Sequence, residues 1–222
     1  MTLIPIKTPF LAKKMFPNYI WDIPSEEKVI YLTFDDGPTP EITDWVIKTL
    51  GEYNAKATFF CIGDNVKKHP HIFNNVLKNG HKVGNHTFNH LKGWKTKSKH
   101  YLKNVIEAKE IIDFQTQNEQ SKHHDLFRPP YGKMTGKQSR KISDLGYKII
   151  MWDVLSFDWV KKITQEQCFE NVITKATNGS IVVFHDSKKA AKNMQYALPK
   201  VLEYFSEKGF VFDAIDFKRT AE

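Results

Sequence analysis

The stretch VIYLTFDDGP, from Val29 to Pro38, decides the fold. Its first six residues are β-branched, aromatic or aliphatic, which predicts a buried strand. The run then stops at two adjacent carboxylates, Asp35 and Asp36. Parallel α/β folds carry their chemistry where the strands end, at the carboxyl edge of the sheet. Asp35 and Asp36 are therefore the first candidate functional residues.

The same pattern of strand and helix continues along the chain. Helical spacing of apolar residues predicts helices at 41–53, 71–77, 99–114, 137–145, 165–176 and 194–208. Runs of strand length predict strands at 29–34, 57–62, 81–86, 125–127, 147–154, 181–184 and 210–215. This alternation predicts a parallel α/β sheet with right-handed crossovers, either closed as a distorted barrel or open as a doubly wound sheet. The first strand lacks a glycine-rich phosphate loop after it, which argues against a dinucleotide or P-loop fold.

The two ends of the chain flank this alternating region. Residues 1–27 are rich in proline, and we expect an extended arm there, a catalytic domain at 28–217 and a short tail at 218–222. The N-terminus lacks the apolar core of a signal peptide, and no run approaches the roughly 20 apolar residues of a membrane span. We therefore expect a soluble, cytoplasmic monomer without a membrane span. A location in the cell envelope or outside the cell stays open.

Charge and cysteine content set further expectations. The formal net charge is +8, and the lysines are densest between Lys92 and Lys103. That stretch, which includes Trp94, could contact nucleic acid, but a solvated loop or a rim beside a substrate fits better, so we expect no nucleic-acid partner. Cys61 and Cys168 lie far apart in the sequence, and we expect two buried, reduced thiols.

Two histidines extend the case for a metal site. Adjacent carboxylates such as Asp35 and Asp36 repel each other, so a nearby cation is expected, although an acidic turn would also explain them. His86 and His90 are four residues apart, and a helical turn would place both on one face, as in many zinc sites or in an ordinary surface helix. Two imidazoles and one carboxylate suit catalytic zinc and also iron(II) oxygenases. Such oxygenases usually have an all-β fold, which this pattern does not predict.

Three more clusters follow strand-like runs. Arg128 opens a stiff proline-containing turn and could pair with a carboxylate in bidentate fashion. His185 follows a buried run, and its unperturbed pKa of about 6.5 suits proton transfer to a leaving amine. Asp158 could be the carboxylate partner of that imidazole, with Trp159 as an aromatic wall. Taken singly, each also has a plain explanation as a loop, surface or core residue.

Together, these clusters resemble the five motifs of the polysaccharide deacetylase family, also called the NodB-homology domain or carbohydrate esterase family 4. The resemblance covers about Lys28 to Ile215, and the motifs are residues 33–38, 86–90, 128–132, 158–159 and 183–185. It implies a distorted (β/α)7-type barrel with parallel strands. It also implies hydrolysis of N-acetyl, and sometimes O-acetyl, groups on a glycan such as peptidoglycan or a chitin-like polymer. A deacylase of another amide and a non-catalytic carbohydrate-binding relative stay as alternatives.

The resemblance also implies a role for each motif residue. Asp36, His86 and His90 would bind a divalent metal, usually Zn²⁺, with Co²⁺, Ni²⁺ or Fe²⁺ as alternatives.

The remaining roles concern proton transfer and substrate binding. Asp35 would be the general base, oriented by Arg128, and the backbone N–H of Tyr131 would help to hold the oxyanion. His185 would be the general acid, tuned by Asp158. Three residues would bind the acetylated substrate: Trp159, Val183 and Pro130.

Two positions depart from the family pattern. Leu155 stands where the fourth motif often has an aspartate, and Val183 stands where the fifth motif commonly has a leucine. We expect the first change to alter hydrogen bonds within the loop and the second to widen the pocket slightly.

Overall fold

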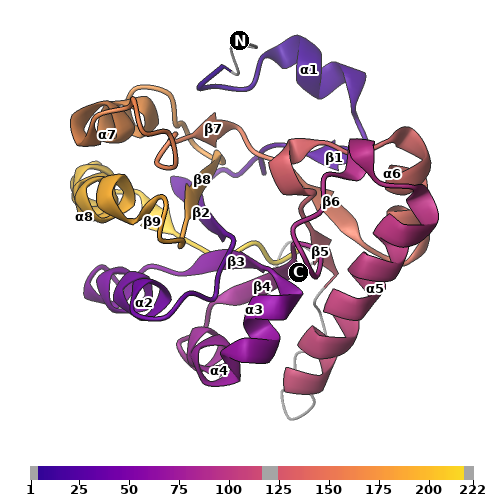
Figure 1. Cartoon of the computed structure of the whole chain (residues 1–222). Helices are drawn as coiled ribbons and strands as arrows, with labels where there is room; N and C mark the ends of the chain where they lie inside the picture. The colour runs from indigo at the N-terminus through magenta and orange to yellow at the C-terminus, as the bar shows by residue number, and fades with distance from the viewer. Residues whose placement is uncertain (1–4, 117–124, 218–222) are drawn as a thin grey trace.

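The computed structural model describes residues 5–116 and 125–217, which form a curled sheet surrounded by helices (Figure 1). The strands are β1 Tyr19–Ile20, β2 Val29–Asp35, β3 Ala57–Cys61, β4 Lys82–Asn85, β5 Leu126–Phe127, β6 Lys148–Ile150, β7 Val154–Leu155, β8 Ile181–His185 and β9 Val211–Phe212. The α-helices are α1 Phe10–Met15, α2 Ile42–Glu52, α3 Gly63–Lys68, α4 Pro70–Lys78, α5 Ser98–Gln115, α6 Gly136–Asp144, α7 Gln165–Ile173 and α8 Ala191–Glu207. Two short 3-10 helices are η1 Gly93–Lys95 and η2 Pro130–Gly132.

The strands are ordered β1-β6-β5-β4-β3-β2-β8-β7, with β9 paired to β2. All of these pairs are parallel. The prediction of a distorted barrel of parallel strands is therefore confirmed. Because every strand runs the same way, the carboxyl ends of β2, β4, β5 and β8 emerge at one rim, and the motif residues follow them.

Phenylalanine side chains fill the layer between the central strands and the helices. The ring of Phe34 on β2 stacks on Phe59 and Phe184 of the neighbouring strands, with centroids 5.0 and 6.1 Å apart. All three side chains are buried. Burial of such large apolar side chains stabilises the central strands. These strands in turn fix the residues at their ends.

Two expectations about local structure are wrong, and one helix is additional. The predicted strand at 147–154 is two strands, β6 and β7, which lie toward opposite ends of the sheet, and residues 151–153 cross between them. The arm expected over 1–27 is not extended throughout, because its described part contains α1 and β1, and β1 pairs with β6. Helix α3 was not expected. The boundaries of the arm and domain stay a prediction, and residues 218–222 lie outside the described residues.

The N-terminal segment spans the seam between the two ends of the sheet. Lys7 forms a bridge with Val154, and Asp22 forms one with Ser180, while β1 pairs with β6 on the other side. In Figure 1, α1 lies above this seam, outside the ring of the other helices. The segment therefore completes the wall where the sheet alone leaves it open.

Two further expectations concern thiols and membranes. Cys61 and Cys168 are both free and buried, as expected. Within residues 5–116 and 125–217, no helix combines the length and the apolar character needed to cross a bilayer.

We predict that Phe34→Ala lowers the free energy of unfolding by about 3–5 kcal/mol, because it leaves a cavity among the stacked rings. Urea denaturation monitored by circular dichroism measures this. Phe114→Ala is the control, since its ring is 64% exposed and its loss should change stability little. Equal effects of the two substitutions would contradict the proposed role of the stacked core.

Candidate active site

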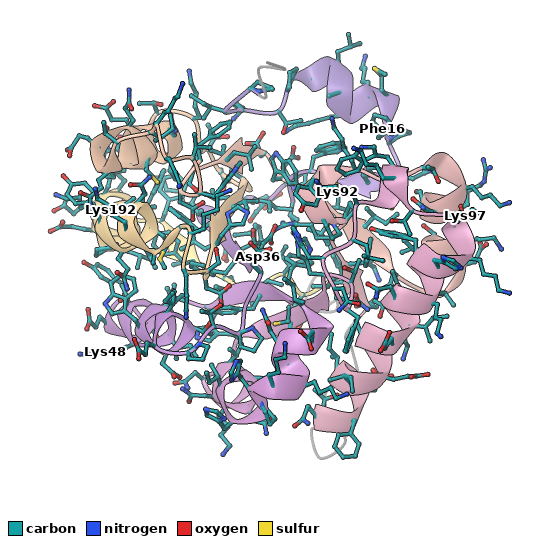
Figure 2. The ribbon with its side chains drawn as sticks, in the orientation of Figure 1. Phe16, Asp36, Lys48, Lys92, Lys97 and Lys192 are labelled. Atoms are coloured by element: carbon teal, nitrogen blue, oxygen red, sulfur yellow. The ribbon has the colours of Figure 1, made fainter. Side chains whose placement is uncertain are left out.

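The predicted site residues converge at one rim of the barrel. Asp35 and His185 are register partners at the ends of β2 and β8. His86 follows β4 and Arg128 follows β5, on the adjoining side of the sheet. Asp36 lies in the middle of the ring of helices (Figure 2). Motif residues that lie up to 150 positions apart in the sequence, as Asp35 and His185 do, thus meet in one place.

A pocket of about 440 Å³ opens at this rim. Eight of the eleven predicted site residues line it, namely Asp35, Asp36, His86, His90, Tyr131, Trp159, Val183 and His185. The other three, Arg128, Asp158 and Pro130, are buried. Five other residues line the pocket and have no role there in the sequence analysis: Gly132, Trp152, Leu155, Ser187 and Lys189.

Asp36, His86 and His90 fit a divalent metal ion. Their ligand atoms all lie within 4.8 Å of one another. Oδ1 of Asp36 lies 3.2 Å from Nε2 of His90 and 3.8 Å from Nε2 of His86. That oxygen is buried and has no hydrogen-bond partner in the described part of the chain. A buried carboxylate oxygen without a donor is costly, and a cation shared with two imidazoles would remove that cost.

Both imidazoles are presented in the neutral form that a metal requires. Burial lowers the pKa of His86 to about 4 and also lowers the pKa of His90. Nδ1 of His86 lies 2.7 Å from the carbonyl oxygen of Arg128, to which it can donate a hydrogen bond. That bond selects the tautomer in which Nε2 carries the lone pair toward Asp36.

The two histidines do not share a helical turn, so that expectation is wrong. They lie in the loop after β4, where Thr87 and His90 have positive φ values of 64° and 55°. The side-chain oxygen of Asn104 on α5 accepts hydrogen bonds from the backbone N–H groups of Phe88 and Asn89. The loop therefore takes its shape from a buried asparagine that lies in another element. The sequence spacing alone carries no sign of this.

Asp35 is held by a buried arginine. Nη1 of Arg128 donates to Oδ1 of Asp35 at 2.7 Å and to the hydroxyl of Thr33 at 2.8 Å. Burial raises the pKa of Asp35, but the positive charge of Arg128, with smaller effects of His86 and His185, outweighs it and holds the pKa below its usual range. Asp35 is therefore a charged carboxylate at neutral pH, available to accept a proton.

His185 has the opposite electrostatic environment. Its Nδ1 lies 2.9 Å from Oδ1 of Asp158, and its backbone N–H donates to Oδ2 of the same carboxylate at 2.6 Å. Burial lowers the pKa of His185, but Asp158, with smaller effects of Asp36 and Asp35, raises it to about 9. The imidazole is therefore protonated at neutral pH, and Nε2 is the ring nitrogen left for a ligand in the pocket.

Asp186 shapes the loop that carries Asp36, a role that the sequence did not reveal. Its carboxylate accepts hydrogen bonds from the backbone N–H of Gly37 at 3.0 Å and from the hydroxyl of Thr43 at 2.5 Å. A Cβ atom at Gly37 would lie 1.9 Å from Asp186 Oδ2, so only glycine fits. The side chain of Asn65 donates to the carbonyl of Asp36 at 2.7 Å. These contacts fix the backbone of the turn that carries Asp36.

The chain is similar to known proteins over most of its length. A family model described as polysaccharide deacetylase matches residues 22–150. A peptidoglycan-N-acetylglucosamine deacetylase of Bacillus cereus is 33% identical over 206 residues, covering 91% of this chain and 94% of that protein.

Solved structures of peptidoglycan deacetylases have a similar fold. A peptidoglycan N-acetylglucosamine deacetylase superposes with a TM-score of 0.83 and 28% identity, covering 94% of this chain and 95% of its own. The peptidoglycan deacetylase PdaC of Bacillus subtilis superposes with a TM-score of 0.75 and 28% identity, covering 87% and 90%.

We predict that Asp158→Asn lowers the pKa of His185 from about 9 toward the unperturbed value of about 6.5, because the substitution removes the largest of the effects that oppose burial. NMR titration of the imidazole resonances measures the change. His81 is an internal control, since its pKa of about 4 arises from burial and a lysine. A His185 pKa that stays near 9 in the variant would show that Asp158 is not the cause.

Proposed function

The chain belongs to the polysaccharide deacetylase family, and we propose that it removes the N-acetyl group from N-acetylglucosamine residues of peptidoglycan. One observation carries this proposal. A metal-ligand triad, a charged carboxylate and a protonated imidazole face a single pocket. Amide hydrolysis needs these three components: activation of water, a proton acceptor and a proton donor.

The choice of substrate rests on the relatives. Those reported above act, by name, on peptidoglycan, and two of them on its N-acetylglucosamine residues. The pocket of this chain fits an acetamido group, since apolar side chains lie beside the charged groups. Leu155, Trp159 and Val183 line it together with Asp35 and His185. The apolar residues would contact the acetyl methyl group.

Asp36, His86 and His90 would hold the metal ion, which we propose to be Zn²⁺. When bound, such an ion lowers the pKa of a coordinated water and polarises the amide carbonyl. Asp36 and the two imidazoles would also place the acetyl group near Asp35 and His185, which line the same pocket.

Asp35 and His185 would divide the proton transfers. The carboxylate of Asp35 accepts a proton from the attacking water, and Arg128 holds that carboxylate in place and charged. The backbone N–H of Tyr131, which follows a proline in a left-handed turn at φ 61°, donates to the developing oxyanion. Nε2 of His185 then donates a proton to the departing amine. The products are acetate and a glycan with a free amine.

Acetate release tests this function. We expect metal-loaded protein to release acetate from peptidoglycan, to lose the activity on treatment with EDTA, and to regain it when Zn²⁺ is added. Chitin oligomers and acetylxylan are compared in parallel to define the glycan and the bond. No release from any of the three, or release that survives chelation, would contradict the proposal.

Substitution of Asp35 and substitution of Asp36 should have different effects. We expect Asp35→Asn to lower kcat by about 100- to 10,000-fold while the metal is retained, because it removes the proton acceptor and leaves Asp36, His86 and His90 in place. Asp36→Asn should lose the metal itself. Metal content by elemental analysis and kcat by acetate release distinguish the two, and thermal unfolding checks that both variants fold. Metal loss in the Asp35 variant alone would exchange the roles.

A further inference from the structure

An aromatic and basic rim stands on one edge of the pocket. It consists of Lys92, Trp94, Tyr131 and Lys133, and we call it the lysine–aromatic rim. The rings of Trp94 and Tyr131 meet edge to face with centroids 5.6 Å apart. Nζ of Lys92 lies 5.4 Å from the centre of the Tyr131 ring, and Nζ of Lys133 lies 5.9 Å from that of Trp94. Tyr131 also lines the pocket and packs on the His90 ring at 4.6 Å. The rim is therefore continuous with the metal site.

The rim is built on two loops that are fastened to each other. Gln138, near the start of α6, donates from Nε2 to the carbonyls of Gly93 and Thr96 at 2.9 and 3.0 Å. A Cβ atom at Gly93 would lie 3.0 Å from the carbonyl oxygen of Lys133, so glycine allows the loops to touch. The two rings are thereby held in place without a ligand. Such preorganisation reduces the entropic cost of binding.

The ammonium groups of the rim have no acidic partners among the residues that the structure describes. In residues 5–116 and 125–217, neither Lys92 nor Lys133 forms an ion pair. Both side chains are exposed, and so are the rings of Trp94 and Tyr131, at 40% and 50%. Lys189, also exposed, lines the pocket from the loop after β8. The pocket mouth thus presents two partly exposed aromatic rings with ammonium groups over them, and no carboxylate of the described residues pairs with these ammonium groups.

We propose that the lysine–aromatic rim binds carboxylate-bearing neighbours of the acetylated sugar, so that the enzyme prefers an anionic glycan strand to a neutral one. This inference rests on the proposed function. Peptidoglycan alternates N-acetylglucosamine with N-acetylmuramic acid, whose lactyl group, or the peptide attached to it, carries carboxylates. The apolar face of a sugar packs on an aromatic ring, and an ammonium group beside that ring pairs with a carboxylate. A chitin-like chain offers the same sugar faces without the charge.

The test compares two soluble substrates: a peptidoglycan tetrasaccharide with free lactyl carboxylates, and neutral chitotetraose. The readout is kcat/KM for the peptidoglycan tetrasaccharide divided by kcat/KM for chitotetraose, measured at low and at high salt. The ratio for the unmodified protein should favour the anionic fragment and fall as salt is added, because salt screens exposed charges. The double variant Lys92→Gln/Lys133→Gln should have a ratio about three- to tenfold lower at low salt, as expected for the loss of two exposed ion pairs. Most of the salt dependence of the ratio should also disappear.

A matched control removes two lysines that also lie over aromatic rings. Lys200 and Lys208 stack on Tyr196 and Tyr204 at 4.9 and 4.7 Å, and neither lysine lines the pocket. Lys200→Gln with Lys208→Gln lowers the net charge by the same amount and should leave the ratio unchanged. An equal fall in the control, or a ratio that favours neither substrate and ignores salt, overturns the proposal.

Binding separates this proposal from the proposed function. Calorimetry measures the affinity of Asp35→Asn for the same two fragments, with and without the Lys92 and Lys133 substitutions. If Asp35→Asn binds the anionic fragment more tightly and the lysine substitutions abolish this preference, the rim proposal is supported. This holds even if no acetate is released from either substrate. Equal affinities for the two fragments overturn the rim proposal and leave the deacetylase proposal to the acetate assay.

Discussion

The site depends on the buried ion pair between Arg128 and Asp35. The guanidinium lies over the Phe60 ring and donates to Asp35, to Thr33 and to two main-chain carbonyls where β6 ends. The carbonyl oxygen of Arg128 can also accept a hydrogen bond from His86, so one residue positions the Asp35 carboxylate and favours one tautomer of His86. Burial of an ion pair costs desolvation free energy, which close geometry and full hydrogen bonding offset. The ion pair therefore holds the Asp35 carboxylate in position. Removal of either partner would leave the other as an unpaired buried charge.

Asp35 and His185, which we propose transfer the protons, have pKa values that their surroundings move in opposite directions. Asp35 and His185 are register partners on neighbouring strands, and burial alone would favour the neutral form of each. The charge of Arg128 outweighs burial at Asp35 and keeps the carboxylate charged. The charge of Asp158 outweighs burial at His185 and keeps the imidazole protonated. A charged base and a charged acid therefore coexist at neutral pH beside one pocket. Such divergence of neighbouring titratable groups is what acid–base catalysis requires.

Sequence reasoning identified what depends on local pattern and missed what depends on distant contacts. Apolar runs of strand length located β2, β3 and β8, and residues at their ends identified Asp35 and His185, because parallel strands gather their ends at one rim. The helical interpretation of His86 and His90 was wrong, since Asn104 on α5 shapes that loop. Spacing within a motif does not reveal a hydrogen bond from another element.

The seam between the ends of the sheet shows why the N-terminal segment contributes to the site. Asp153 is 2% exposed, and it pairs with Lys13 at 2.7 Å and with Lys7 at 3.1 Å. Two lysines from the N-terminal segment thus hold residues 151–153, which connect β6 to β7 and belong to neither strand. Trp152 lies in that crossover and lines the pocket, and a Cβ atom at Gly132 would lie 2.3 Å from its ring. Because the N-terminal lysines hold Asp153, they also set the position of the neighbouring pocket wall.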